Sequence, residues 1–286
     1  MKKILLSLLV LVMLAGCSTT PKAPETTVTP TPEETATTDT ETGATQDATT
    51  SASMVVEDLV KDYAPKGFTD ADTEKALVVV GDPRHYSVTW DLANTAMAYL
   101  EEKGMEVEVR DLYAMNFNPV LSEEDFYYAK DGAGEASEAI KTEQELVTAA
   151  DHIIFVYPNW HDSEIAIVKG YKEEVFAKKF AYQDGANGLE GLLTDKTIYT
   201  IMNCGYLGGG RGWIGDGIID TETWDKYMNA FDVFDQDTAA FWGVTSLGRF
   251  VNDRTPANNS ENYAEELKEL EDSLISHLDS VYFSKN

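Results

Sequence analysis

The sequence predicts an α/β fold: a doubly wound, five-stranded parallel sheet covered by helices on both faces, in three layers. Continuous β-branched and apolar runs, as in residues 76–80 and 153–157, are typical of strands buried on both faces of a parallel sheet. Helical segments alternate with these runs, and repeated βα units with right-handed crossovers produce such a sheet. Five strands suggest the order 2-1-3-4-5.

The first expected strand, residues 76–80, is an unbroken run of Ala, Leu and Val. A helix follows, closed by Gly104. Its apolar stripe consists of Leu92, Ala93, Ala96, Met97 and Leu100. Residues 105–110 alternate in polarity, which predicts the second strand. Residues 122–150 are acidic and Ala-rich, and we expect helices there with a break near Asp131-Gly132.

The later elements follow the same alternation. The third strand, residues 153–157, is stopped by Pro158, and a helix is expected from about 164 to 177. Residues 197–202 predict the fourth strand, which runs into a Gly-rich loop, and residues 239–245 predict the fifth. The last helix, about 260–278, carries apolar residues at helical spacing: Tyr263, Leu267, Leu270, Leu274 and Leu278.

The composition excludes several classes of protein. Among 286 residues, 22 Lys and Arg face 50 Asp and Glu, giving a formal net charge of -28. Binding to nucleic acid or to an anionic lipid surface needs a dense cationic face, so neither is expected. With two cysteines, a disulfide scaffold and a Cys-based zinc site are excluded.

The first 17 residues resemble a bacterial lipoprotein signal. Lys2 and Lys3 precede an apolar run over 4–14 that is too short to span a membrane. The run ends in Leu14-Ala15-Gly16-Cys17, which resembles a lipobox and implies acylation of Cys17. We therefore expect an extracytoplasmic protein, lipid-anchored to the bacterial membrane. The alternative is an ordinary secretory signal with a chance cysteine.

Residues 18–73 are expected to separate this anchor from the folded domain, residues 74–282. From 18 to about 53 the chain is rich in Thr, Pro, Ala, Ser and acidic residues and has no aromatic residue, which predicts a disordered tether. Residues 54–73 form a short neck. With Cys17 acylated, Cys204 has no partner for a disulfide, and we expect it to be a buried small hydrophobe.

Several motifs carry a family resemblance. They include Asp111-Leu112-Tyr113 with Phe117-Asn118-Pro119, Glu143-Gln144, Tyr157-Pro158, residues 166–171, Val175-Phe176 and Phe180-Ala181-Tyr182. Together they resemble the NAD(P)H:quinone oxidoreductase family, flavodoxin-like enzymes that contain FAD or FMN. The resemblance covers about 75–206. Phe117, Pro119, Val168 and Val175 are interpreted as packing residues, which indicate fold rather than activity.

The resemblance implies a non-covalent flavin, FAD or FMN, at the carboxyl ends of the first and third strands, in loops 81–89, 157–164 and 203–214. It places Ser87, Val88 and Thr89 at the flavin phosphates; capping of the helix is the alternative reading for Ser87 and Thr89. Asp82 stands where the family has a His. A carboxylate there repels phosphate unless Arg84 or His85 neutralises it.

The other two loops supply the remaining candidates. After the third strand these are Pro158, Asn159, Trp160, His161 and Asp162, and Trp160 is expected to stack on the flavin ring. A divalent cation on His161 and Glu164 is a weak alternative, so no metal is predicted. After the fourth strand the cofactor candidates are Asn203, Cys204 and Gly205; Tyr206 is the nearest catalytic phenol, and Tyr182 matches a substrate-pocket aromatic.

Two functions compete at this stage. The first is a surface-anchored flavoprotein that passes a hydride from a nicotinamide or other electron donor to a quinone-like acceptor, in a homodimer if the resemblance holds. The second is a non-enzymatic, ligand-binding lipoprotein that keeps the fold and turns an acidic pocket, with Asp82, Asp162 and Glu164, to another ligand. No Gly-x-Ser-x-Gly elbow is present, which argues against a hydrolase.

Overall fold

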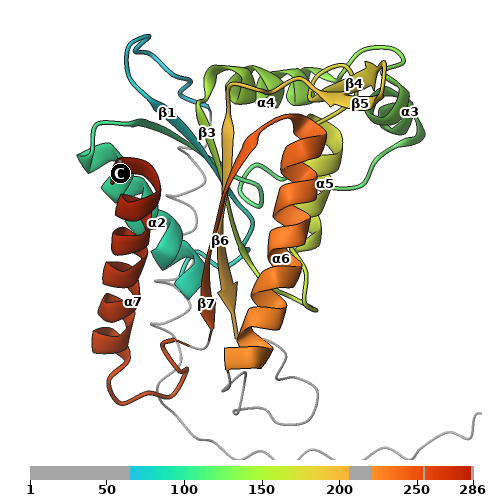
Figure 1. Cartoon of the computed structure of the whole chain (residues 1–286). Coiled ribbons are helices and arrows are strands. Elements are labelled where there is room, and N and C mark those ends of the chain that lie inside the picture. Colours follow the sequence, from blue (N-terminus) through green and yellow to red (C-terminus); the bar gives the residue numbers. More distant parts are fainter. Residues whose placement is uncertain (1–64, 206–220, 254, 285–286) are drawn as a thin grey trace, which may run out of the picture. The chain divides into compact units, whose positions relative to one another are not determined.

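The computed structural model describes residues 65–205, 221–253 and 255–284 (Figure 1). Its main sheet has five parallel strands in the order β2-β1-β3-β6-β7. These strands are β1 (Lys75–Val80), β2 (Glu106–Asp111), β3 (His152–Pro158), β6 (Thr197–Cys204) and β7 (Thr245–Asp253). Taken along the chain, this is the predicted order 2-1-3-4-5, which is confirmed.

The helices of the described ranges lie on both faces of the sheet (Figure 1). They are α2 (Val88–Glu102), α3 (Glu123–Asp131), α4 (Glu138–Ala149), α5 (Ala166–Val175), α6 (Thr221–Trp242) and α7 (Tyr263–Leu278), followed by the π-helical turn η2 (Asp279–Phe283). The predicted break between α3 and α4 is present at Gly132, in the left-handed conformation. Among the described residues, no helix combines the length and apolar character needed to cross a membrane.

Alternation along the strands produces two hydrophobic cores. In β1, Leu77 and Val79 face the core formed with α4, α5 and α6, whereas Ala76, Val78 and Val80 face the core formed with α2 and α7. Every one of these five side chains is fully buried. The continuous apolar runs in the sequence therefore reflect strands covered on both faces, as predicted.

The predicted fifth strand at 239–245 is wrong. Residues 239–242 belong to the end of the 22-residue helix α6, and the strand, β7, begins at Thr245. Phe231, Asp235, Ala239 and Trp242 are buried at helical spacing, which reveals the periodicity that a local reading of 239–245 missed. Gly243, with φ +79, then leads from the helix into the strand.

The other predicted bounds agree with the structure to within three residues, but one feature was not predicted. Two short antiparallel strands, β4 (Tyr182–Gly185) and β5 (Gly188–Gly191), form a hairpin between α5 and β6. The Asn187-Gly188 pair in its turn is a common hairpin signal.

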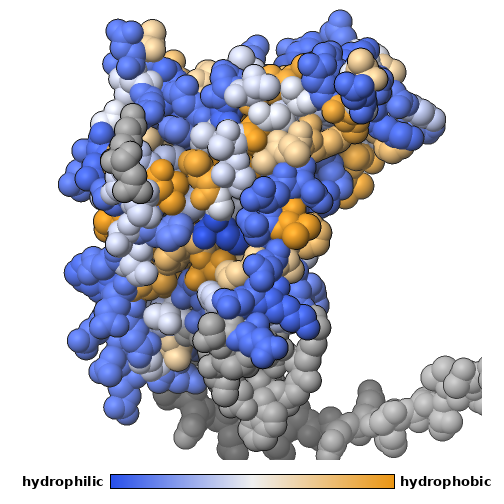
Figure 2. All heavy atoms as spheres, viewed as in Figure 1, coloured by the Kyte–Doolittle hydropathy of each residue, from blue (hydrophilic) through white to orange (hydrophobic). Residues whose placement is uncertain are grey.

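Residues 65–73, from the expected neck, are attached to the edge strand β2. The backbone N–H of Lys66 donates to the Glu108 carboxylate at 3.2 Å, and Thr69 donates to Glu106 through its backbone N–H and its hydroxyl at 2.6 and 2.8 Å. The predicted signal peptide and tether lie outside the described residues. On the face shown in Figure 2, hydrophilic residues surround several separate groups of apolar residues.

Candidate functional site

The loops that follow β1 and β3 meet the carboxyl end of β6 at one edge of the sheet, as the strand order requires. The Asn159 backbone N–H donates to the Asn203 carbonyl at 2.8 Å. The Asn203 side-chain amide donates to Thr89 Oγ1 at 3.3 Å, and its oxygen accepts from Asn252 at 2.9 Å. Three predicted cofactor residues, Thr89, Asn159 and Asn203, are therefore brought together.

The N-terminus of α2 is capped from within the chain. Ser87 is the N-cap, and its hydroxyl accepts from the Trp90 backbone N–H and donates to Asp82 Oδ2 at 3.0 Å. The capping interpretation is thus confirmed for Ser87. Thr89 is not the cap: it lies fully buried in the first turn, and Val88, before it, is half-buried.

Arg84, not His85, neutralises Asp82. The Arg84 guanidinium binds both carboxylate oxygens, at 3.1 Å through Nε and 2.9 Å through Nη2. His85 instead forms a short contact with the buried Asp111. Hydrogen bonding to Asp82 raises the pKa of Arg84, which stays cationic.

The loop after β3 folds back in a tight turn. Trp160 and Ser163 exchange backbone hydrogen bonds at 3.0 and 3.3 Å, and His161 and Asp162 between them have φ near +58 and +59. The turn leaves Trp160 44% exposed, with the Arg84 guanidinium carbon 5.9 Å from its ring centroid. The indole is consequently open to stacking.

Asn159 follows β3 and Cys204 ends the neighbouring strand β6, and their side chains form a hydrogen bond. The Asn159 side-chain oxygen is buried and has no hydrogen-bond partner among the described residues. Cys204 is buried as predicted, and burial, helped by the Asp253 charge, raises the pKa of its thiol to about 12. The thiol is therefore neutral near pH 7 and cannot act as a nucleophile.

Two other candidates, Glu164 and Tyr182, stand apart from this cluster. The carboxylate of Glu164 pairs with Lys172 on α5, which does not favour the weak alternative of a divalent cation on His161 and Glu164. Tyr182, the predicted substrate-pocket residue, lies on β4 and donates from its hydroxyl to the Ala129 carbonyl. Tyr206, the catalytic candidate, lies outside the described residues. Pro158 is buried, whereas His161 and Gly205 are exposed.

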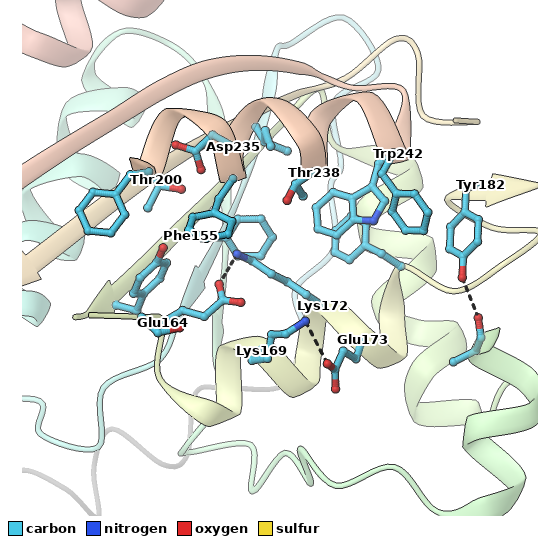
Figure 3. A pocket seen from close by; sticks show the side chains of 18 of the residues that line it. Phe155, Glu164, Lys169, Lys172, Glu173, Tyr182, Thr200, Asp235, Thr238 and Trp242 are labelled. Carbon is cyan, nitrogen blue, oxygen red and sulfur yellow. Dashed lines mark hydrogen bonds and ion pairs between the residues drawn. The ribbon is translucent and has the colours of Figure 1, made fainter. Parts of the chain in front are cut away.

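A cavity of about 740 Å³ lies between α5 and α6 over the sheet (Figure 3). Its lining includes Phe155, Tyr157, Phe176, Tyr182, Phe231 and Trp242. Arg249 and Asp235 form a bidentate pair at 2.8 and 2.7 Å in its wall. The sequence analysis did not predict this cavity. Its lining residues come from β3, α5, α6 and β7, among other segments, and they come together only when the chain folds.

Part of the carboxyl edge fits a flavin. The unpartnered Asn159 oxygen and the exposed Trp160 ring are suited to the polar edge and the flat face of a tricyclic ring. At the α2 end the fit is different, since the cap and Arg84 already hold the carboxylate of Asp82.

Comparisons with known proteins agree with this architecture. A family model for the flavodoxin-like fold matches residues 74–274. A Haemophilus influenzae protein named an uncharacterized NAD(P)H oxidoreductase is 38% identical over 114 residues, 40% of this chain and 55% of that protein. An FMN-dependent NADH:quinone oxidoreductase of Macrococcus caseolyticus is 31% identical over 212 residues, 68% of this chain and 92% of that protein.

Among solved structures, an NAD(P)H:quinone oxidoreductase from Methanothermobacter marburgensis has a TM-score of 0.55 and 18% identity, and the match covers 71% of this chain and 98% of that one. This likeness shows the fold alone. The chain spans about half the length of the curated relatives it matches first. The family match and the Macrococcus relative show that the chain belongs to the flavodoxin-like NAD(P)H:quinone oxidoreductase family.

Proposed function

We propose that this protein is a flavoprotein that transfers a hydride from NAD(P)H to a quinone-like acceptor. One observation carries the proposal: the carboxyl edge presents an unpartnered buried oxygen, on Asn159, beside the exposed ring of Trp160. The relatives' names supply the reaction class, since the Macrococcus protein is an FMN-dependent NADH:quinone oxidoreductase.

In this proposal the flavin, FMN or FAD, supplies the two-electron chemistry, and the chain supplies position and environment. The side chain of Asn159 accepts a hydrogen bond from the polar edge of the ring, and Trp160 covers part of its face. Asn203, on β6, holds the loop after β3, α2 and β7 together through its contacts with Asn159, Thr89 and Asn252. No described thiol takes part, because Cys204 stays protonated.

The test begins with the colour of the purified protein. We expect a yellow protein that releases FMN or FAD on denaturation, or a colourless one that turns yellow with added flavin. Oxidation of NADH or NADPH should then depend on an added quinone, followed by nicotinamide absorbance. A protein that takes up no flavin under either condition would contradict the proposal.

Replacing Trp160 with alanine should weaken flavin binding about fivefold, because an aromatic contact of this kind contributes about 1 kcal/mol beyond burial. Flavin fluorescence quenching measures the affinity. Tyr263→Ala, which removes another exposed aromatic from α7 on the other side of the sheet, is the matched control and should leave the affinity unchanged. Equal affinities for wild type and Trp160→Ala would show that the indole does not contact the ring.

We further propose that Cys17 carries lipid and anchors the protein outside the cytoplasm, on the strength of Leu14-Ala15-Gly16-Cys17. Cys17→Ser should shift the protein from the membrane fraction to the soluble fraction, because acyl chains supply the membrane affinity. Membrane fractionation and immunoblotting measure the shift, and Ser18→Ala is the control. A Cys17→Ser protein that still sediments with membranes refutes lipidation.

The cavity between α5 and α6 favours a second candidate, a non-enzymatic ligand-binding protein. Its volume lies within the range of small-molecule sites, and it is rich in aromatic side chains. Four cationic side chains (Lys130, Lys169, Lys172 and Arg249) balance four carboxylates (Asp162, Glu164, Glu173 and Asp235) in its lining, which suits a neutral ligand. A colourless protein whose melting temperature rises with neutral aromatic compounds would support this candidate over the flavoprotein.

A further inference from the structure

The N-terminus of α2 already contains an anion, the side chain of Asp82. We propose that Asp82 occupies the place that a flavin phosphate would take, so that the protein binds riboflavin, which lacks the phosphate, at least as tightly as FMN. The inference rests on the proposed flavoprotein function and names the form of flavin that the site prefers.

The polar groups around Asp82 donate hydrogen bonds to its carboxylate, as they would to a bound anion. Its carboxylate is fully buried. It accepts from the Arg84 backbone N–H at 2.9 Å, from Arg84 Nε and Nη2, and from the Ser87 hydroxyl at 3.0 Å. A backbone N–H, a bidentate guanidinium and a hydroxyl at a helix N-terminus are the donors that commonly hold a phosphate. Here they hold a side chain of the chain itself.

These donors have little capacity left for a second anion. The single hydroxyl hydrogen of Ser87 is directed to Asp82, and its oxygen accepts from Trp90. Arg84 could reach a phosphate with the same nitrogens only by leaving Asp82, and a buried carboxylate without its cation is costly. A phosphate beside the intact pair would instead meet a guanidinium whose charge Asp82 already balances, so the pair offers it no net positive charge.

The sequence context fits this explanation. Asp82 comes directly after Gly81, at the end of β1, so its position is fixed by the strand and by the Trp90 indole, which donates to the Asp82 carbonyl at 3.0 Å. The Asp82 carboxylate could leave this place only by breaking its bonds to Arg84 and to Ser87, the N-cap of α2. We infer that flavin affinity comes from the ring, through Asn159 and Trp160, and that the phosphate adds nothing to it.

The experiment compares riboflavin and FMN on the same protein by fluorescence quenching. Wild type should bind riboflavin at least as tightly as FMN. Asp82→Asn keeps the shape and frees Arg84, and should raise the affinity for FMN relative to riboflavin about tenfold or more. Asp91→Asn removes a carboxylate from the first turn of α2, one that interacts with Glu271 on α7, and should change the ratio of the FMN and riboflavin affinities less than about twofold.

Ser87→Ala gives an independent test if Asp82→Asn fails to fold. Since the Ser87 hydroxyl donates to Asp82, its loss should weaken riboflavin and FMN equally; selective loss of FMN would show that the hydroxyl binds phosphate and would overturn the inference. If wild type binds FMN tightly and Asp82→Asn has the same ratio of FMN to riboflavin affinity, the inference about Asp82 is also overturned. The proposed flavoprotein function is not affected by that result. Failure of wild type to bind any flavin refutes that function and the inference together.

Discussion

Replacing Glu143 with leucine is expected to lower the free energy of unfolding by about 3–5 kcal/mol, because it leaves the charge of Arg110 buried without its main partner. Both side chains are only 4% exposed. Arg110 Nε donates to both Glu143 oxygens at 3.1 and 3.0 Å, and Nη2 donates to one of them. The Tyr171 hydroxyl adds a third donor at 3.1 Å, so the carboxylate joins β2, α4 and α5.

Urea denaturation followed by circular dichroism measures this loss. The double variant Glu143→Leu/Arg110→Met removes both charges and should recover most of the stability, since the cost comes from a buried charge that has lost its hydrogen-bonded partner, with Glu108 at 3.9 Å as a longer contact, rather than from the loss of the pair. Asp272→Ala breaks the exposed pair with Lys268 on α7 and should cost less than about 0.5 kcal/mol. A Glu143→Leu loss no larger than that of Asp272→Ala would contradict the buried-pair account.

Most of the sheet could be predicted because its signals are local. A strand buried on both faces must be apolar at nearly every position, and β1 and β3 meet this condition, with Val80 and Val156 fully buried. The strand β7 was misplaced because its residues are mostly half-buried and contain Ser246, Gly248 and Arg249, so they lack that signature. The apolar residues on which the wrong prediction of a strand at 239–245 was based, such as Ala239 and Trp242, belong to the buried stripe of α6.

The candidate site was predictable where topology or short sequence separation determines it. The strand order brings Thr89, Asn159 and Asn203 to one edge, and Arg84 lies two residues from the Asp82 that it neutralises. The cavity between α5 and α6 was not predictable, since residues such as Arg249 on β7 and Asp235 on α6 meet only after the helices pack on the sheet. No local pattern marks such pairs.

Two of the family motifs pack against each other: Phe117-Asn118-Pro119, after β2, and residues 166–171, in α5. The rings of Phe117 and Tyr171 lie 5.4 Å apart, and Pro119 lies against Gly170 in α5. Val168 and Val175, on the same helix, are fully buried, which confirms their interpretation as packing residues. The motifs therefore record how the loop after β2 packs on α5, and they specify fold rather than catalysis.

Gly170→Ala is accordingly expected to destabilise the protein by about 2–3 kcal/mol, despite the better helix propensity of alanine. A Cβ at this position would lie 2.4 Å from both the Cβ and the carbonyl oxygen of Pro119, and backbone atoms cannot move aside as a flexible side chain can. Thermal and urea denaturation measure the loss. We expect the variant to lower the unfolding midpoint without changing the slope, because the native contacts elsewhere are retained.

Lys169→Ala, one residue earlier in α5, is the matched control. Its side chain is 57% exposed and pairs with Glu173 one turn away, so its loss should cost less than about 0.5 kcal/mol. Equal stability of Gly170→Ala and Lys169→Ala would mean that the loop carrying Pro119 moves away from α5 at little cost. The close contact between Gly170 and Pro119 would then not be the reason for glycine at this position. A loss confined to Gly170→Ala shows instead that the family glycine is required by the proline opposite it.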